Sequence, residues 1–220
     1  MVQPDEIIRS NRKTLSLSID SFGRLIVRAP KRCSDGRIFA FIRQKEGWIL
    51  RKQAQRQGAG ISLPTENLDG YTLLLLGKNC TITLTDEPSV RFDNQTNRLF
   101  LPKTNAKTRL VQWIKENAKR ILSQATANAA AEMGVTYKSV TITSAKTRWG
   151  SCSANNAIHY SFRLLYAPKE VVQYVVYHEL AHVRHKNHSA TFWAEVTKYC
   201  PQWRTHRAWL KQYAYLMEIL

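Results

Sequence analysis

Acidic residues, paired cysteines and long apolar runs are all scarce in this chain of 220 residues. The four cysteines are scattered, with no spacing typical of a zinc knuckle or a redox motif, so we expect free thiols rather than a disulfide framework. The longest apolar run of note, Leu73–Leu76, is far too short to cross a bilayer. The first six residues contain no basic stretch followed by an apolar one, as a secretory leader would. These absences predict a soluble, cytoplasmic protein with no membrane partner.

The shortage of acidic residues leaves a net charge of +17, from 33 lysines and arginines against 16 aspartates and glutamates. The excess is uneven along the chain. Residues 1–57 hold 13 basic and 5 acidic groups, a net of +8, whereas residues 58–100 hold 3 and 5, a net of −2. A field of this size attracts polyanions such as nucleic acid, nucleotides or acidic proteins. A well-solvated basic surface without a specific partner explains the charge equally well, so both interpretations stay open.

The first half of the sequence predicts mainly β structure. Alternating apolar residues predict a hairpin over 14–29. A capped apolar pattern then predicts one helix from Ser34 or Asp35 to about Gln57, where Gly58 ends it. Four short strand-like stretches separated by turn residues predict a small meander over 71–101.

The second half of the sequence predicts helices around a short sheet. The expected strands cover 139–143, 148–153 and 157–161, and the expected helices cover about 108–133, 168–186, 189–199 and 202–217. This order of elements predicts an α+β fold. We expect a domain boundary near residue 103, between a β-rich N-terminal domain over 1–102 that contains one helix and a catalytic domain over 103–220.

One helical segment carries the chemistry, His178-Glu179-Leu180-Ala181-His182. The four-residue spacing puts both imidazoles on one helix face, where they can share one ion at Zn–N distances of about 2.0–2.1 Å. In an H-E-x-x-H site the carboxylate lies beside a metal-bound water and acts as general base. The apolar neighbours of these residues would bury them, and buried histidines and glutamates need partners. We therefore predict a zinc (Zn2+) site with ligands His178 and His182 and with Glu179 as the catalytic base, rather than ordinary core histidines.

A catalytic zinc site needs a third protein ligand. In a continuous helix, His185 would lie about 10 Å along the axis from His178, too far for both to share one small ion. Asn187 favours a left-handed residue that ends the helix, and Ser189 can cap the next helix. The turn between them would bring His188 back to the site. We predict His188 as the third ligand, and a surface loop residue is the alternative.

Other candidates near this motif have weaker support. Cys152 is not expected as a fourth ligand, because one coordination position must stay open for water. His159 and His206 have no partner at a suitable spacing, so we expect them to be structural or exposed. The segment 148–153 could be an edge strand that binds an extended peptide beside the metal helix. Alternatively, Trp149 belongs to the core and Gly150 forms a bulge.

The residues around the motif resemble a known family. The resemblance rests on 148–153, 168–176, the H-E-x-x-H segment, Asn187-His188-Ser189 and Phe192-Trp193, which are closely similar to the YgjP-like family of zinc metallopeptidases and more distantly to SprT-like proteins. It covers most of the chain, and the second half is the specific part. It implies a zincin-like catalytic domain with a β-rich N-terminal extension. It also implies His178, His182 and His188 as ligands and Glu179 as the catalytic residue.

The residues and the resemblance together favour a zinc-dependent hydrolase of the metallopeptidase type, in which water activated by Glu179 attacks a peptide carbonyl. Two alternatives stay open. A metal-dependent nucleoside triphosphate pyrophosphatase is supported by the charge and the resemblance alone, since no glycine-rich phosphate loop is present. A DNA-associated, SprT-like protease would use the basic segment 1–57 to contact nucleic acid. The sequence does not distinguish a peptide from a nucleotide substrate, and it does not indicate an oligomeric state.

Overall fold

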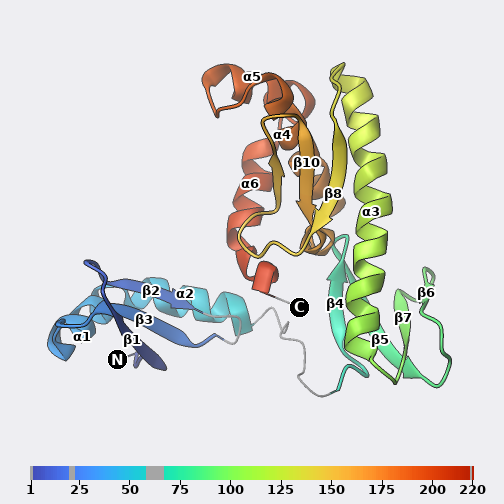
Figure 1. Cartoon of the computed structure of the whole chain (residues 1–220). Coiled ribbons are helices and arrows are strands. Elements are labelled where there is room, and N and C mark those ends of the chain that lie inside the picture. Colours follow the sequence, from blue (N-terminus) through green and yellow to red (C-terminus); the bar gives the residue numbers. More distant parts are fainter. Residues whose placement is uncertain (1, 20–22, 58–66, 219) are drawn as a thin grey trace. The chain divides into compact units, whose positions relative to one another are not determined.

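The structure is a computed structural model that describes residues 2–19, 23–57, 67–218 and 220 (Figure 1). The chain divides into two compact units, one ending at Ser62 and the other beginning at Leu63. Helices and three small sheets make up the described residues, which confirms the predicted α+β class. The boundary predicted near residue 103 falls inside the second unit.

The first unit is built on a three-stranded sheet. Its strands are β1 (Glu6–Ser10), β2 (Ser16–Ile19) and β3 (Leu25–Pro30), in the order β1-β3-β2. The predicted hairpin corresponds to β2 and β3, which pair antiparallel. The sequence did not predict β1, which pairs parallel with β3 and has two adjacent isoleucines in place of an alternating pattern.

Two helices pack against this sheet, where the sequence predicted one. These helices are α1 (Asp35–Gln44) and α2 (Glu46–Gln57), and the predicted helix end at Gly58 lies outside the described residues. The chain leaves helical geometry at Lys45, with φ −105° and ψ 9°. Ile42 of α1 and Ile49 of α2 nevertheless belong to the same core, on both sides of this break.

The second unit begins with a four-stranded sheet. Its strands are β4 (Thr72–Leu75), β5 (Lys78–Thr85), β6 (Arg91–Asp93) and β7 (Arg98–Pro102). The predicted meander is wrong in its order, because the sheet runs β4-β5-β7-β6 and β7 pairs parallel with β5. The apolar residues Leu99 and Leu101 of β7 are fully buried, whereas short, charged β6 takes the edge.

The rest of the second unit contains the helices and the sheet that surround the metal motif. The long helix α3 (Ala106–Met133) lies beside both sheets of this unit (Figure 1) and ends at Gly134 in left-handed geometry, as predicted. The second sheet has the order β8-β10-β9, and the remaining helices follow it. These elements are β8 (Ser139–Thr143), β9 (Gly150–Cys152), β10 (Ala157–Ser161), η1 (Phe162–Tyr166), α4 (Lys169–Arg184), α5 (Ala190–Tyr199), α6 (Trp203–Gln212) and η2 (Ala214–Glu218).

Strand β9 lies at an edge of its sheet. It pairs antiparallel with β10, which pairs parallel with β8 on its other side. The strand is next to α4, the helix that carries the metal motif. Among the residues that the structure describes, no helix is both long enough and apolar enough to cross a membrane.

Candidate metal centre

Helix α4 holds the first two candidate ligands and the candidate base in a rigid frame. Its apolar face is buried within the second unit and consists of Val171, Val172, Val175, Val176 and Leu180. His178 and His182 lie on the same face, with ring centroids 5.1 Å apart, as the four-residue spacing predicts. Because α4 packs along its length, these two side chains are held before any ligand binds.

The end of α4 differs from the prediction. The helix was expected to reach Lys186 and to end with Asn187 in left-handed geometry, but it ends at Arg184, and His185 is extended with φ −125°. Because the helix ends early, the His185 carbonyl turns back and accepts a hydrogen bond of 2.9 Å from Nδ1–H of His182. His185 therefore contributes its backbone to the site.

Arg184 connects this end of α4 to α3 and α5. Its guanidinium donates to the carbonyl oxygens of Met133 at 2.7 Å and Gly134 at 3.1 Å, where α3 ends. It also pairs with the Glu195 carboxylate on α5. The last turn of α4 is thus tied to two other helices, which fixes the starting point of the loop that carries the third candidate ligand.

His188 reaches the site from that short loop. The Asn187 side-chain oxygen accepts a hydrogen bond from the backbone N–H of Ser189 at 3.2 Å. The Ser189 hydroxyl accepts one from the N–H of Phe192 at 3.4 Å and so caps α5, as the sequence predicted. These bonds hold exposed His188 with its Nε2 atom 3.1 Å from Nε2 of His178.

The three predicted ligands therefore come together. His178, His182 and His188 each offer one ring nitrogen, and all of these nitrogens lie within 4.8 Å of one another. Two ligands at the usual Zn–N distance in a tetrahedral site lie roughly 3.3 Å apart, close to the separation between His178 and His188. The geometry of the donor set fits one small metal ion.

The protonation of the rings also fits a metal. Since the His185 carbonyl accepts from Nδ1–H of His182, Nε2 of that ring keeps its lone pair for a ligand. Burial, and then the neighbouring His182 and His188 rings, lower the pKa of His178 to about 3, so this ring is neutral at physiological pH. Its Nδ1 atom is buried with no hydrogen-bond partner among the described residues, and a metal ion on Nε2 would not supply one.

Phe192 forms the floor of the histidine cluster. Its ring is fully buried, with centroids 4.9 Å from His178, 4.5 Å from His182 and 4.8 Å from His188. The next residue, Trp193, stacks on the His188 ring at 5.6 Å. Sequence reasoning gave neither aromatic residue a role of its own. Their position four and five residues after His188 was the available signal.

Glu179 lies on the buried side of the same helix turn. Its side chain is only 5% exposed, and this burial raises the pKa of its carboxyl to about 8. Gly150 of β9 faces it closely: a Cβ atom built on this glycine would lie 2.7 Å from Glu179 Oε1. Position 150 requires glycine because the Glu179 carboxylate lies too close for a side chain. The bulge that the sequence suggested is not the reason, since Gly150 pairs in register with Tyr160.

The remaining candidates lie outside the cluster. Half-buried Cys152 is on β9 and is not part of the histidine cluster. Burial raises the pKa of its thiol, and the nearby Glu179 carboxylate also raises it. Half-buried His159 lies on β10, and half-buried His206 lies on α6 with its ring 6.1 Å from Tyr174. Trp149, only half-buried, accepts a backbone hydrogen bond from Ser161 at 2.9 Å.

Comparisons with known proteins place this site in a family. Among solved structures, the crystal structure of the metallopeptidase zymogen of Pyrococcus abyssi abylysin is 23% identical, with a TM-score of 0.38, over 41% of this chain and 93% of that one. No curated protein matches the chain. The family model described as YgjP-like, metallopeptidase domain, matches residues 13–213 and thus includes the whole histidine cluster. The chain therefore belongs to the YgjP-like family of metallopeptidase domains.

Proposed function

We propose that this chain is a zinc-dependent metallopeptidase whose ion is held by His178, His182 and His188. Membership of the YgjP-like family supports a hydrolase of the metallopeptidase type. The convergence of three ring nitrogens within 4.8 Å is the observation that carries the choice of ligands. Three neutral imidazoles with a further coordination position left open are the donor set of a catalytic zinc site.

Glu179 is the proposed general base. When bound, zinc would supply Lewis-acid polarisation and a lowered pKa for water. Burial keeps the pKa of the Glu179 carboxyl near 8 in the metal-free protein, and a divalent cation at the adjacent histidines would lower that pKa. The carboxylate then accepts a proton from the attacking water at Oε1 or Oε2 and donates it to the leaving amine.

The edge of β9 supports a peptide as the substrate. Within the described part of the chain, β9 pairs with β10 on one side and has no strand on the other. An extended peptide can add to such an edge through backbone hydrogen bonds, which bind any sequence. Gly150, at the start of β9, lies directly against Glu179, so a peptide on this edge would pass the catalytic carboxylate.

Two variants on α4 test the base. We expect Glu179→Gln to reduce chelator-sensitive cleavage of casein by about a hundredfold or more, with zinc content unchanged. Glu170→Gln is the matched control, because Glu170 is an exposed carboxylate in the first turn of the same helix. Full activity of a zinc-loaded Glu179→Gln protein would rule out this role.

The third ligand and the substrate class are tested separately. We expect His188→Ala to lose most of its bound zinc, measured by elemental analysis of the purified protein. Unchanged zinc content would exclude His188 as a ligand. Parallel assays with nucleoside triphosphates, with and without chelator, address the pyrophosphatase alternative. Chelator-sensitive phosphoanhydride hydrolysis without casein cleavage would replace the peptidase proposal by a pyrophosphatase.

A further inference from the structure

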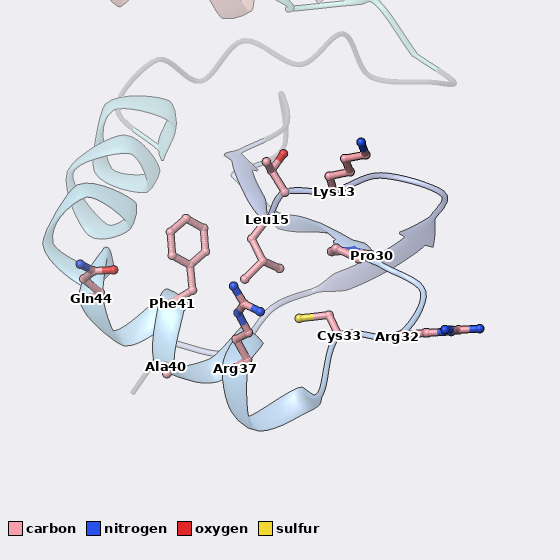
Figure 2. Close-up of a pocket in the computed structure, with 10 residues that line it drawn as sticks. Lys13, Leu15, Pro30, Arg32, Cys33, Arg37, Ala40, Phe41 and Gln44 are labelled. Carbon is pink, nitrogen blue, oxygen red and sulfur yellow. The ribbon is translucent and has the colours of Figure 1, made fainter.

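The first unit contains a pocket that uses no residue of the metal centre. It lies where β3 leads into α1, bordered by the segment before β2 and by one face of α1, and its volume is about 780 Å³ (Figure 2). Pockets that bind small ligands have volumes of about 300–1,000 Å³. This pocket is therefore large enough for a nucleotide-sized group.

The lining of the pocket is positively charged. Lys13, Arg32 and Arg37 line it, and no aspartate or glutamate does. None of the three cations makes a hydrogen bond or ion pair with another described residue. The acid between them in sequence, Asp35, is paired with the Arg9 guanidinium. Among the residues that the structure describes, no acid balances the positive charge of this pocket, which lies within a segment whose net charge is +8.

An aromatic side chain, Phe41, also lines this pocket. Figure 2 shows Phe41, Leu15 and Arg37 pointing toward the middle of the pocket, while Arg32 and Lys13 extend outward at its rim. Phe41 is half-buried and is not among the hydrophobic side chains packed against the core of this unit. Core packing therefore does not account for Phe41, whose ring offers an apolar face in the same pocket as the three cations.

We propose that this pocket binds a nucleotide unit of a single-stranded nucleic acid, with the base on Phe41 and the adjoining phosphates on Arg37, Arg32 and Lys13. An unpaired base stacks on an aromatic ring, and a guanidinium fork matches phosphate oxygens. A duplex would keep its bases paired and inaccessible to the ring. An acidic peptide would use the cations without needing the ring. The net charge of +8 over residues 1–57 exceeds what one free nucleotide requires, which favours a strand.

Binding of a labelled oligouridylate of roughly 12 nucleotides to the full chain tests the proposal by fluorescence anisotropy. We expect Phe41→Leu to weaken binding about fivefold or more and Phe41→Tyr to retain it, because only the first removes the aromatic face. We expect Arg37→Ala to weaken binding and to reduce the slope of log affinity against log salt by about 0.7. Chelator should leave binding unchanged, which separates this pocket from the metal centre.

Arg43→Ala is the matched control for Arg37→Ala, since Arg43 is an exposed arginine on the same helix that does not line the pocket. Circular dichroism checks folding, and if Phe41→Leu does not fold, the comparison of the two arginine variants decides. Equal losses for Arg37→Ala and Arg43→Ala would overturn the proposal, as would an absence of binding at low salt. Competition by uridine triphosphate as strong as by the strand would indicate a mononucleotide site instead. Equal affinity for polyglutamate, insensitive to Phe41→Leu, would indicate an acidic protein.

Discussion

The Glu179 carboxylate rests directly on the backbone of Gly150. A Cβ atom at position 150 would lie 2.7 Å from Oε1, 2.9 Å from Cγ and 3.0 Å from Cδ of Glu179. Real Cβ atoms essentially never approach other atoms this closely, so any side chain at Gly150 must displace the carboxyl group. Strand β9 thus sets the position of the proposed base from outside the helix that carries it.

Gly150→Ala should impair catalysis while leaving the ligands in place. The added methyl group displaces the Glu179 carboxyl by a large part of an ångström, and such misplacements lower rates by about ten- to a hundredfold. Zinc content should not change, since the three atoms nearest to the added Cβ all belong to Glu179. Steady-state kinetics and elemental analysis measure the two effects. Gly36→Ala is the control, because a Cβ there meets nothing within 4 Å, and full activity of Gly150→Ala would show that this contact is catalytically irrelevant.

Phe192→Leu should weaken zinc binding more than it weakens the fold. Its ring supports all three histidines, and changes to the groups that orient metal ligands cost about ten- to a hundredfold in affinity. The free energy of unfolding should fall by about 1–2 kcal/mol. Phe162→Leu is the matched control: Phe162 is equally buried and has no ring contact with the cluster. Equal zinc affinities for the two variants, measured by competition with a chromophoric chelator, would contradict the role of Phe192 as a support.

Ser189→Ala should affect the loop that holds His188. The variant loses the cap of α5 and about 1 kcal/mol of stability. Because Ser189 follows His188 directly, the loosened loop should also release zinc faster, which stopped-flow mixing with chelator measures. Ser189→Thr keeps a hydroxyl that can cap, so its zinc release should stay close to that of the unmodified chain. Identical release from all three proteins would show that the cap does not hold this ligand.

The metal-free protein should lose stability as pH rises from about 6.5 to about 8. Burial raises the pKa of Glu179 from 4.5 to about 8, so the folded chain binds the extra proton and the free energy of unfolding falls across that range. Burial lowers the pKa of His178 from 6.5 to about 3, so between these two pH values the unfolded chain binds the extra proton. The free energy of unfolding that depends on His178 therefore rises with pH below 6.5, and it opposes the Glu179 effect only there.

Urea unfolding in the presence of chelator at a series of pH values measures this trend. Glu179→Gln has no proton to lose and should abolish the decline between pH 6.5 and 8. Glu170→Gln removes an exposed carboxyl and should leave the decline intact. A decline that persists in Glu179→Gln would assign it to another group.

Local signals account for the features that the sequence predicted correctly. The spacing of His178 and His182 sets their common helix face, Gly134 ends α3, and Ser189 caps α5. Each depends on residues within about one helical turn, where backbone geometry decides the outcome. The α+β class followed because the strand and helix patterns are well separated along the chain.

Contacts between distant segments account for what the sequence did not show. The early end of α4 depends on Arg184 reaching the carbonyls of Met133 and Gly134, about fifty positions away. The contact of Gly150 with Glu179 joins a strand to a helix through tertiary packing. The residues next to Phe192 in the sequence indicate only that it is an apolar residue of a helix. No local sequence pattern predicts these three contacts, because they form only when the helices and strands pack together.

The three proposed ligands are imidazoles, so none of them carries a negative charge. A zinc ion held by this set would keep both of its positive charges, and Glu179 is the only buried carboxylate among the described residues. Such a centre would be strongly electrophilic and would attract anions. The proposed peptide cleavage would create a new carboxylate near this site, in a protein whose net charge of +17 also attracts anions. Departure of the acidic product, rather than scission of the bond, is therefore expected to limit turnover.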